Sequence, residues 1–516
     1  EEGSEYLIPA IYKSYIYDYG FDIIYFSDML PLITKVTFSK ENMIGIIYHL
    51  QDQDNRQKIF LNNDAFKILK TMMPDEIKTY INNAIKDDEI ITRIKEYNPD
   101  LLCFSCTTVV DREDTKYLIY MLKNNGINIP IVLGGHEVSH NYEQILSDNS
   151  IERDKIDYIK CISLGLGQPY ISDICNYVLN DCKGKLPLNI AININGKVIA
   201  NWDKSSLYKS INNYALPDYS LLDKVYVRGR SKPYDVYSFI GNTHAGDIKT
   251  LDKQKNNMSY FPIFTSYGCG NNCTFCDTDQ YLIRYSLENV KRMVENYEQN
   301  YGIDYIDFMD NNFAGGNQIS REICFSILDY IYKKGYNIGF SNGLTFESMM
   351  RNNFELLKTF SNHNNVQHIA FPCENGNDRV LKMIRKPHNL EMINKTLNCA
   401  KEILKNTNKE GFFIGGFPET LGKLPETPEE VWNTVNFIEY LLKNEYLNQA
   451  IFLKLSPVTS IYREMWNKKY PNTSFAHCLF SRGTEIWPYD NDILESARVK
   501  TNEINQNYCR KITRKL

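Results

Sequence analysis

The sequence lacks several features that would each define a class of protein. It has no run of 18 apolar residues, so no membrane span is predicted. Neither sign of charge dominates, because 58 basic and 63 acidic side chains leave a net charge of −5, which gives no general attraction to nucleic acid or an anionic membrane. Its 13 cysteines in 516 residues are too few for a disulfide scaffold. With a loop of thiolates present as well, this cysteine usage predicts a reducing cytoplasm. No signal-peptide pattern opens the chain, and it starts at Glu1 rather than methionine, so we expect an N-terminus that is trimmed or incomplete.

Three of the cysteines, Cys269, Cys273 and Cys276, lie within eight residues of one another in a glycine-containing loop. Thiolates bind iron–sulfur clusters, and a four-iron cluster takes one ligand per iron, so three ligands leave one iron open for a substrate or cosubstrate. A structural zinc loop is the alternative. Zinc usually takes four ligands from paired cysteines, however, and no second pair follows, since the next cysteine is Cys324. The spacing therefore favours a cluster.

With Phe275 directly before its last cysteine, this loop resembles the Cys-x3-Cys-x-aromatic-Cys motif of the radical SAM superfamily. The resemblance implies a [4Fe–4S] cluster whose open iron chelates S-adenosylmethionine (SAM). Reduction, by an external donor of the flavodoxin or ferredoxin type, would then release a 5′-deoxyadenosyl radical.

Residues 1–182 read as strands alternating with helices, which predicts a parallel, doubly wound, Rossmann-like α/β sheet. Ligands of such sheets bind beyond the carboxyl ends of the strands. We expect strands at 21–26, 101–104, 129–133 and 157–163, and helices at 8–19, 64–73, 75–97, 114–125, 143–146 and 169–179.

This first domain resembles the cobalamin-binding domain that precedes many radical SAM barrels. The resemblance lies in Asn98-Pro-Asp100 before a strand, in the stretch from Pro130 to Gly135, and in the Gly165-x-Gly167 turn. No Asp-x-His-x-x-Gly signature occurs, so no protein histidine need ligate cobalt, and His136 and His140 are expected to be surface or packing residues. The alternative is an empty flavodoxin-like sheet kept for architecture. The residues that the resemblance assigns to the nucleotide tail and lower face of cobalamin are Ser105, Thr107, Gly134, Gly135, Gly165 and Gly167.

Residues 183–258 read as a connector that contains a small hairpin around an Asn-Gly turn. Residues 259–458 contain six strand–helix units, which predict the open, partial (β/α)6 barrel of radical SAM enzymes, and 459–516 form a C-terminal extension. Each predicted barrel strand ends in polar residues or glycine, at what is the active face of a β/α barrel. The six barrel strands are expected at 261–265, 305–309, 337–340, 367–371, 411–414 and 450–455.

The radical SAM resemblance also implies contacts with SAM. Asp310 and Asn311 would hold the methionine amine, and Asn342 and Glu374 would meet the ribose and carboxylate. Gly415, Gly416 and Phe275 would pack against the adenine. The alternative for each residue alone is a loop cap. Arg385 and Lys386 could bind a carboxylate, but basic residues after such loops are usually solvated.

The expected function is that of a cobalamin-dependent radical SAM enzyme, most simply a C-methyltransferase acting on an unactivated carbon of a natural product or peptide. The radical would abstract hydrogen, and the carbon radical would take a methyl group from cobalt. One alternative uses both cofactors for a cyclisation, rearrangement or oxidation without methyl transfer. A second has a vestigial first domain, and a third is a non-catalytic iron–sulfur or zinc module. The partners expected are a small-molecule or peptide substrate and the electron donor, with neither nucleic acid nor membrane.

Overall fold

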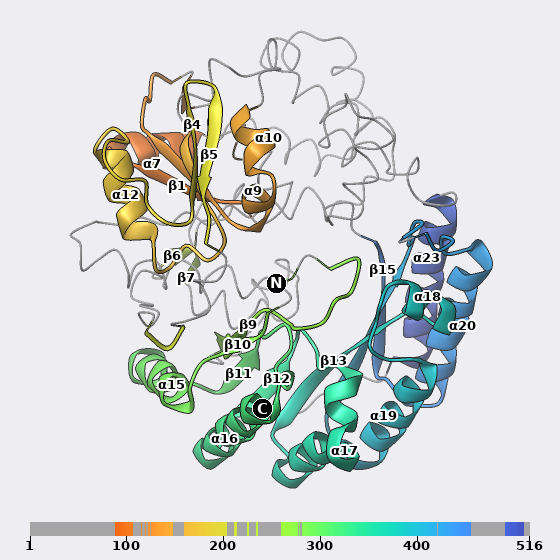
Figure 1. The fold of residues 1–516 in the computed structure, drawn as a ribbon. Helices are drawn as coiled ribbons and strands as arrows, with labels where there is room; N and C mark the ends of the chain where they lie inside the picture. The colour runs from red at the N-terminus through yellow and green to blue at the C-terminus, as the bar shows by residue number, and fades with distance from the viewer. Residues whose placement is uncertain are drawn as a thin grey trace. The chain divides into compact units, whose positions relative to one another are not determined.

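In this computed structural model, two compact units are formed, one by the described residues before position 240 and one by those after it (Figure 1). The predicted strand at 21–26, the helices at 8–19 and 64–73, and Thr107 lie outside the described residues. The structure describes residues 88–106, 115, 119, 122–123, 125–147, 159–203, 211–213, 224–225, 234–235, 260–276, 278, 281–420, 422–455 and 491–509.

The first unit is built on a five-stranded sheet with the order β1-β2-β3-β4-β5. Strands β1, β2 and β3 are parallel, as the alternating pattern predicts. Successive residues of β2 point to opposite faces: Ile131 and Leu133 pack toward α9 and α10, whereas Val132 packs toward α12. The sheet is therefore covered on both faces. The elements are α7 (Asp88–Tyr97), β1 (Leu102–Ser105), β2 (Ile131–Gly134), α9 (His136–His140), α10 (Tyr142–Ser147), β3 (Ile159–Ser163), α12 (Ile171–Leu179), β4 (Ile190–Ile194) and β5 (Lys197–Asn201).

The hairpin of β4 and β5 belongs to this sheet, because β4 pairs antiparallel with β3. The sequence places the same hairpin in the connector, since a local turn signal does not say which edge a hairpin will join. Its turn has the predicted chemistry: Asn195 and Gly196 both have positive φ, at 53° and 83°, as a tight hairpin turn requires. Three short elements follow: η3 (Ile211–Asn213), β6 (Lys224–Val225) and β7 (Tyr234–Asp235).

The second unit contains a six-stranded, fully parallel sheet with the order β15-β14-β13-β12-β11-β8, which confirms the partial barrel. Figure 1 shows α16, α17, α19 and α20 along the outer side of this sheet. The elements are β8 (Tyr260–Ile263), β9 (Ser266–Tyr267), β10 (Ile283–Arg284), α15 (Leu287–Tyr301), β11 (Tyr305–Phe308), α16 (Gln318–Lys334), β12 (Asn337–Phe340), α17 (Phe346–His363), β13 (Val366–Glu374), α18 (Asp378–Met383), α19 (Leu390–Ile403), β14 (Asn408–Gly415), α20 (Pro428–Lys443) and β15 (Gln449–Lys454).

Local sequence signals set the ends of the barrel helices. Ser286 caps α15 by accepting a hydrogen bond from the Asn289 amide, as expected from the sequence. Gly335 closes α16 in the left-handed conformation, with φ of 79°. Thr427 and Glu430 form a reciprocal capping box at the start of α20. These caps fix where each helix begins and ends, and thereby where the loops on the strand ends start.

The described part of the C-terminal extension is α23 (Asn491–Tyr508). This helix packs against α20 and the edge strand β15. The Asn505 side chain bonds both the amide and the carbonyl of Ala450, at 3.0 and 2.6 Å, and so satisfies backbone groups at the sheet edge. None of the helices within the described ranges combines the length and apolar character needed to cross a membrane.

Candidate functional site

The carboxyl ends of the six barrel strands meet at one edge, because all six are parallel. The loop with the three cysteines follows β8 there, and the polar ends of β11, β12, β13 and β14 lie along the same edge. The ring of Phe275, which is predicted to pack against the adenine, contacts the ring of Phe417, which directly follows the predicted Gly415 and Gly416; the ring centroids are 5.4 Å apart in an edge-on arrangement. The candidate site is therefore the cysteine loop and the strand ends beside it.

The cysteine loop is held by hydrogen bonds from outside itself. Gly268 and Gly270 have positive φ, at 74° and 76°, which lets the backbone curl around Cys269. The carbonyl of Cys269 accepts a bond of 2.9 Å from Asn312 Nδ2. The amide of Thr274 donates 3.0 Å to the carbonyl of Ile384, at the end of α18. The loop is thus fixed at two points, one on each side of Cys273.

The three thiols of the loop lie close enough to act on one another electrostatically, since, in addition to burial, Cys269 and Cys276 both raise the pKa of Cys273, and Cys276 raises that of Cys269. Among the residues that the structure describes, no three Cys, His, Asp or Glu side chains are placed to bind a single metal ion together. A four-iron cluster fits this arrangement, because each thiolate binds a different iron, whereas zinc gathers its ligands at about 2.0–2.3 Å. The donor set therefore suits the cluster better than the zinc alternative.

Burial controls the protonation of these thiols. Burial raises the pKa of Cys273 to about 11, although the positive charge of Lys386 acts in the opposite direction. Burial likewise raises the pKa of Cys269. At neutral pH these two side chains are protonated thiols in the metal-free protein, so binding iron must displace their protons.

Asp310 is buried and holds the residues that lead from β8 into the cysteine loop. Its carboxylate accepts hydrogen bonds from the Thr265 amide at 3.1 Å, from Thr265 Oγ1 at 2.8 Å and from Ser266 Oγ. The side chain is 1% exposed, and burial raises its pKa even though the Arg284 guanidinium opposes this. Arg284 also donates to Thr265 Oγ1 at 3.3 Å. The resemblance to radical SAM enzymes assigned Asp310 to the methionine amine of SAM, but in the structure its carboxylate oxygens accept hydrogen bonds from Thr265 and Ser266.

Asn312, which the sequence analysis did not select, faces the loop instead. It is 5% exposed, and its buried Oδ1 has no hydrogen-bond partner within the described part of the chain. A Cβ on Gly315 would lie 2.3 Å from Asn312 Nδ2, so glycine is required there for the amide to fit. Asn311 is exposed. Three polar residues in a row after a strand were the only signal, and sequence alone does not tell which of them points inward.

Glu374 and Lys386 form a buried ion pair beside the cysteine loop. Lys386 Nζ lies 2.7 Å from Glu374 Oε1, and the two side chains are 10% and 9% exposed. The same Nζ lies 5.6 Å from the centre of the Phe275 ring. Burial alone would lower the pKa of Lys386, but the Glu374 carboxylate and the Cys273 thiolate outweigh it and raise the pKa. The expectation that Lys386 is solvated is therefore wrong.

Glu426 is a further buried carboxylate, and the sequence analysis did not select it. It is 1% exposed and accepts bonds from the Gly416 amide at 2.6 Å, the Phe417 amide at 3.3 Å and Asn375 Nδ2 at 2.7 Å. It thereby fixes the turn that carries the Phe417 ring. Gly415 is required for packing, because a Cβ there would lie 2.6 Å from the Phe452 ring.

Asn342 is engaged on a neighbouring strand end. Its Nδ2 donates 2.6 Å to the carbonyl of Met309, which links the end of β12 to the end of β11. Asp307 makes a second link, accepting from the Ser341 amide at 3.1 Å. These bonds hold adjacent strand ends in register, and Asn342 itself is half-buried.

The buried His388 is expected to make the stability of the fold depend on pH in the acidic range. It is 5% exposed, and burial, helped by the charge of Lys386, lowers its pKa to about 3. Between about pH 3 and its unfolded pKa of about 6.5, only the unfolded state binds the proton, so stability falls as the pH is lowered through this window. We expect His388→Gln to remove a slope of up to about 1.4 kcal/mol per pH unit from the free energy of unfolding. Urea unfolding of the apoprotein at pH 7 to 4.5 measures this, with the exposed His363→Gln as control; equal slopes in parent and His388→Gln would contradict it.

In the first unit, the carboxyl ends of β1, β2 and β3 also share an edge. Ser105 ends β1, Gly134 ends β2, and Gly135 follows as the first residue after β2. Gly135 has φ of 105°, and a Cβ there would lie 2.4 Å from the Cys106 carbonyl oxygen, so the backbone approach alone requires glycine. Ser139 Oγ links the ends of β2 and β3, because it lies 2.8 Å from the Gly135 carbonyl oxygen and 3.3 Å from the Ser163 carbonyl oxygen.

Buried polar atoms lie next to the Gly165–Gly167 turn, which follows β3 at the same edge of the sheet. The Gly165 amide donates 3.1 Å to Ser139 Oγ, which fixes the Gly165–Gly167 turn. Beside this turn, Ser163 Oγ and Gln168 Oε1 are buried and have no hydrogen-bond partner among the residues that the structure describes. Buried polar atoms without partners are costly, so a ligand that satisfies them would be favoured here.

His136 and His140 lie together on α9, with ring centroids 4.1 Å apart. His140 Nδ1 lies 2.9 Å from the His136 carbonyl oxygen, and its side chain is exposed. This matches the expected role of a surface residue for His140.

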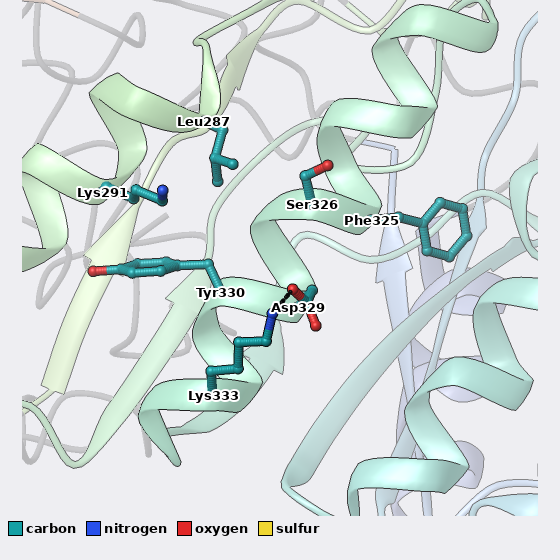
Figure 2. A pocket seen from close by; sticks show the side chains of 7 residues that line it. All are labelled: Leu287, Lys291, Phe325, Ser326, Asp329, Tyr330 and Lys333. Atoms are coloured by element: carbon teal, nitrogen blue, oxygen red, sulfur yellow. Dashed lines mark hydrogen bonds and ion pairs between the residues drawn. The ribbon is translucent and has the colours of Figure 1, made fainter.

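A surface hollow of about 470 Å³ lies between α15 and α16, on the helical layer rather than at the strand ends (Figure 2). Lys333 pairs with Asp329 there at 2.6 Å, and Lys291 Nζ lies 5.7 Å from the Tyr330 ring centre. No site residue selected from the sequence lines this hollow. It is lined by Leu287, Lys291, Phe325, Ser326, Asp329, Tyr330 and Lys333.

Two family models match the chain, the B12 binding domain over residues 63–159 and the radical SAM superfamily over residues 263–438. The chain is 22% identical over 399 residues to cytidylyl-2-hydroxyethylphosphonate methyltransferase of Streptomyces wedmorensis, covering 73% of this chain and 68% of that one. It is 24% identical over 211 residues to tRNA-2-methylthio-N(6)-dimethylallyladenosine synthase of Thermosipho africanus, covering 39% of this chain and 46% of that one.

Solved structures with a similar fold include two described as binding cobalamin. The cobalamin-dependent SAM radical enzyme OxsB superposes with a TM-score of 0.51 at 16% identity, over 75% of this chain but only 49% of OxsB. The radical SAM methyltransferase TsrM from Kitasatospora setae gives 0.50 at 13% identity, over 74% of this chain and 68% of TsrM. At these identities the likeness shows the fold. With both family models matched in this order along one chain, the protein belongs to the cobalamin-dependent radical SAM enzymes, in which a B12-binding domain precedes the radical SAM domain.

Proposed function

We propose that this enzyme is a C-methyltransferase that transfers a methyl group to an unactivated carbon of a natural product or peptide. The observation that carries the proposal is a three-cysteine loop at the carboxyl edge of a six-stranded barrel, in a chain that also carries a B12-binding domain. Two similar proteins are described as methyltransferases, which supports methyl transfer over other radical outcomes.

Cys269, Cys273 and Cys276 would hold the cluster, each on a separate iron. Their half-buried loop, tied to Asn312 and Ile384, would position it without a fourth protein ligand from the loop. When bound, the cluster and SAM supply a 5′-deoxyadenosyl radical and cobalamin supplies the methyl group. The protein supplies binding, orientation and exclusion of water.

For the SAM contacts, Asn312 takes the place proposed for Asp310 and Asn311. Its buried Oδ1 could accept a hydrogen bond from the methionine amine, whereas the Asp310 oxygens are engaged by Thr265 and Ser266. Phe275 and Phe417 offer apolar surface for the adenine, with the turn at Gly415 and Gly416 fixed behind them by Glu426. Asn342 and Glu374 remain the proposed polar groups toward the ribose and carboxylate.

Asn312→Ala tests this assignment. Losing one buried hydrogen-bond acceptor to a charged group costs about 1.5–3 kcal/mol, so we expect SAM to bind the loaded protein about tenfold to a hundredfold more weakly. Equilibrium dialysis with labelled SAM measures this, after iron analysis has established equal cluster content, because Asn312 also bonds the Cys269 carbonyl. The exposed neighbour provides the matched control, Asn311→Ala, which should bind SAM as the parent does. Equal affinity in Asn312→Ala would contradict the assignment.

For cobalamin, the strand ends of the first unit offer small residues and spare polar atoms along one edge. Ser105, Gly134, Gly135, Gly165 and Gly167 would line the nucleotide tail and lower face, and Thr107 would join them. The partnerless Ser163 Oγ and Gln168 Oε1 support a polar ligand at this edge.

The experiment that tests the function is an incubation of the anaerobically loaded enzyme with methyl-labelled SAM, a reductant, and small-molecule or peptide fractions of the producing cells. Methyl transfer predicts 5′-deoxyadenosine and S-adenosylhomocysteine in equal amounts, with label in a product. Deoxyadenosine without S-adenosylhomocysteine would identify a cyclisation, rearrangement or oxidation instead. No cleavage of SAM would identify a non-catalytic module. The partners proposed are that substrate and an external flavodoxin- or ferredoxin-type electron donor.

A further inference from the structure

The end of α18 delivers a lysine to the cysteine loop. Arg385 has φ of 57°, which ends the helix in a left-handed turn, and the Lys386 amide donates 3.0 Å to the Leu381 carbonyl across that turn. Two residues before Lys386, the Ile384 carbonyl accepts a hydrogen bond from the amide of Thr274, within the cysteine loop itself. The backbone that carries Lys386 is therefore bonded to the backbone that lies between Cys273 and Cys276.

The Lys386 ammonium is confined at this position. Glu374 Oε1 lies 2.7 Å from it, the Phe275 ring centre lies 5.6 Å from it, and its side chain is 10% exposed. Its charge acts on the Cys269 and Cys273 thiols, favouring their thiolate forms. A fixed cation in a partly desolvated site acts more strongly on neighbouring charge than one in water.

Glu374 holds the pair in place from the strand side. It ends β13 with φ of 62°, a conformation that is uncommon for residues other than glycine, and it is 7% exposed. Such backbone geometry persists only where surrounding contacts enforce it and tends to occur at functional sites. Here it turns the carboxylate toward Lys386.

We propose that Lys386 and Glu374 are positioning residues that set the reduction potential of the cluster held by the three cysteines, with opposite effects. This rests on the proposed function only in requiring that the loop binds the cluster. Reduction adds one electron, from the flavodoxin- or ferredoxin-type donor, to an anionic centre. The lysine charge favours that electron and the glutamate charge opposes it.

The opposite signs define the experiment. Lys386→Met removes the cation and leaves the carboxylate, so the midpoint potential should become more negative. Glu374→Gln leaves the cation unopposed, so the potential should become more positive. We expect each shift to correspond to about a tenfold change in the one-electron reduction equilibrium, about 59 mV. The double variant should return toward the parent value, and Lys386→Arg, which keeps the charge, should stay near it.

The measurement is a redox titration of the anaerobically loaded protein, followed by the EPR signal of the reduced cluster without SAM. Iron and sulfide analysis comes first, because absence of a cluster in the parent would refute the function rather than this inference. If Lys386→Met does not bind the cluster, the midpoint potentials of Glu374→Gln and Lys386→Arg test the proposal. The exposed Lys382→Met, on α18 just before the turn that carries Lys386, is the matched control and should not shift the potential. Equal potentials in all loaded variants would overturn the proposal, as would a loss of SAM affinity with no shift in potential.

Discussion

Cys273→Ala is expected to abolish the cluster and all SAM cleavage while leaving the fold intact. Two thiolates then remain for a centre that takes one ligand per iron, so two irons lack a protein ligand instead of one. Iron analysis after anaerobic loading should fall from about four per chain to near zero. The fold should persist, because Cys273 is a half-buried loop residue and small substitutions at such positions usually cost about 1 kcal/mol or less.

The matched control for this variant is Cys399→Ala. Cys399 is also a half-buried free cysteine, but it lies on α19, within the helical layer. It should load iron and cleave SAM as the parent does. Full activity in Cys273→Ala, or loss of iron in both variants, would refute the assignment of the loop as the cluster ligand.

Asp310→Asn is expected to produce the largest loss of stability. All the groups that face the Asp310 carboxylate are donors: the Thr265 amide, Thr265 Oγ1 and Ser266 Oγ. An asparagine would turn a donor of its own toward them and would remove the negative charge that faces Arg284, which is 8% exposed. Breaking such a buried charge arrangement costs about 3–5 kcal/mol.

Urea unfolding measures the stability, and iron analysis measures the effect on the cysteine loop, whose first residues Asp310 supports. The control is Asp329→Asn on the exposed face of α16, where loss of its pair with Lys333 should cost about 0.5 kcal/mol or less. An Asp310→Asn protein as stable as the parent would show that the buried network contributes little. A stable protein without iron would separate the role in the loop from the role in the fold.

Much of the barrel could be predicted from the sequence because its signals are local. Each of the six strands is a short apolar run between helical patterns, and each ends in polar residues or glycine, so the parallel sheet and its active edge follow. The cysteine loop is likewise a contiguous motif. The hairpin β4–β5 shows the limit, since its turn is readable but its pairing with β3 depends on a distant edge.

The side chains at the site were harder to predict, because their roles depend on tertiary burial. Lys386 reads as a solvated lysine, yet the left-handed turn at Arg385 aims it at Glu374. Asp310, Asn311 and Asn312 are equally polar in the sequence, and only the fold determines that the first and third are buried, that the second is exposed, and that Asn312 bonds the cysteine loop. Glu426 lies in a loop with no motif, and its role appears only where it meets the Gly416 amide.

The most direct measurement is the EPR spectrum of the reduced, anaerobically loaded protein with and without SAM labelled with ¹⁷O in its carboxylate. If one iron of the cluster lacks a protein ligand, SAM should change the spectrum and the label should add hyperfine coupling. An identical spectrum in both samples, or a protein that binds only a colourless metal, would contradict the account.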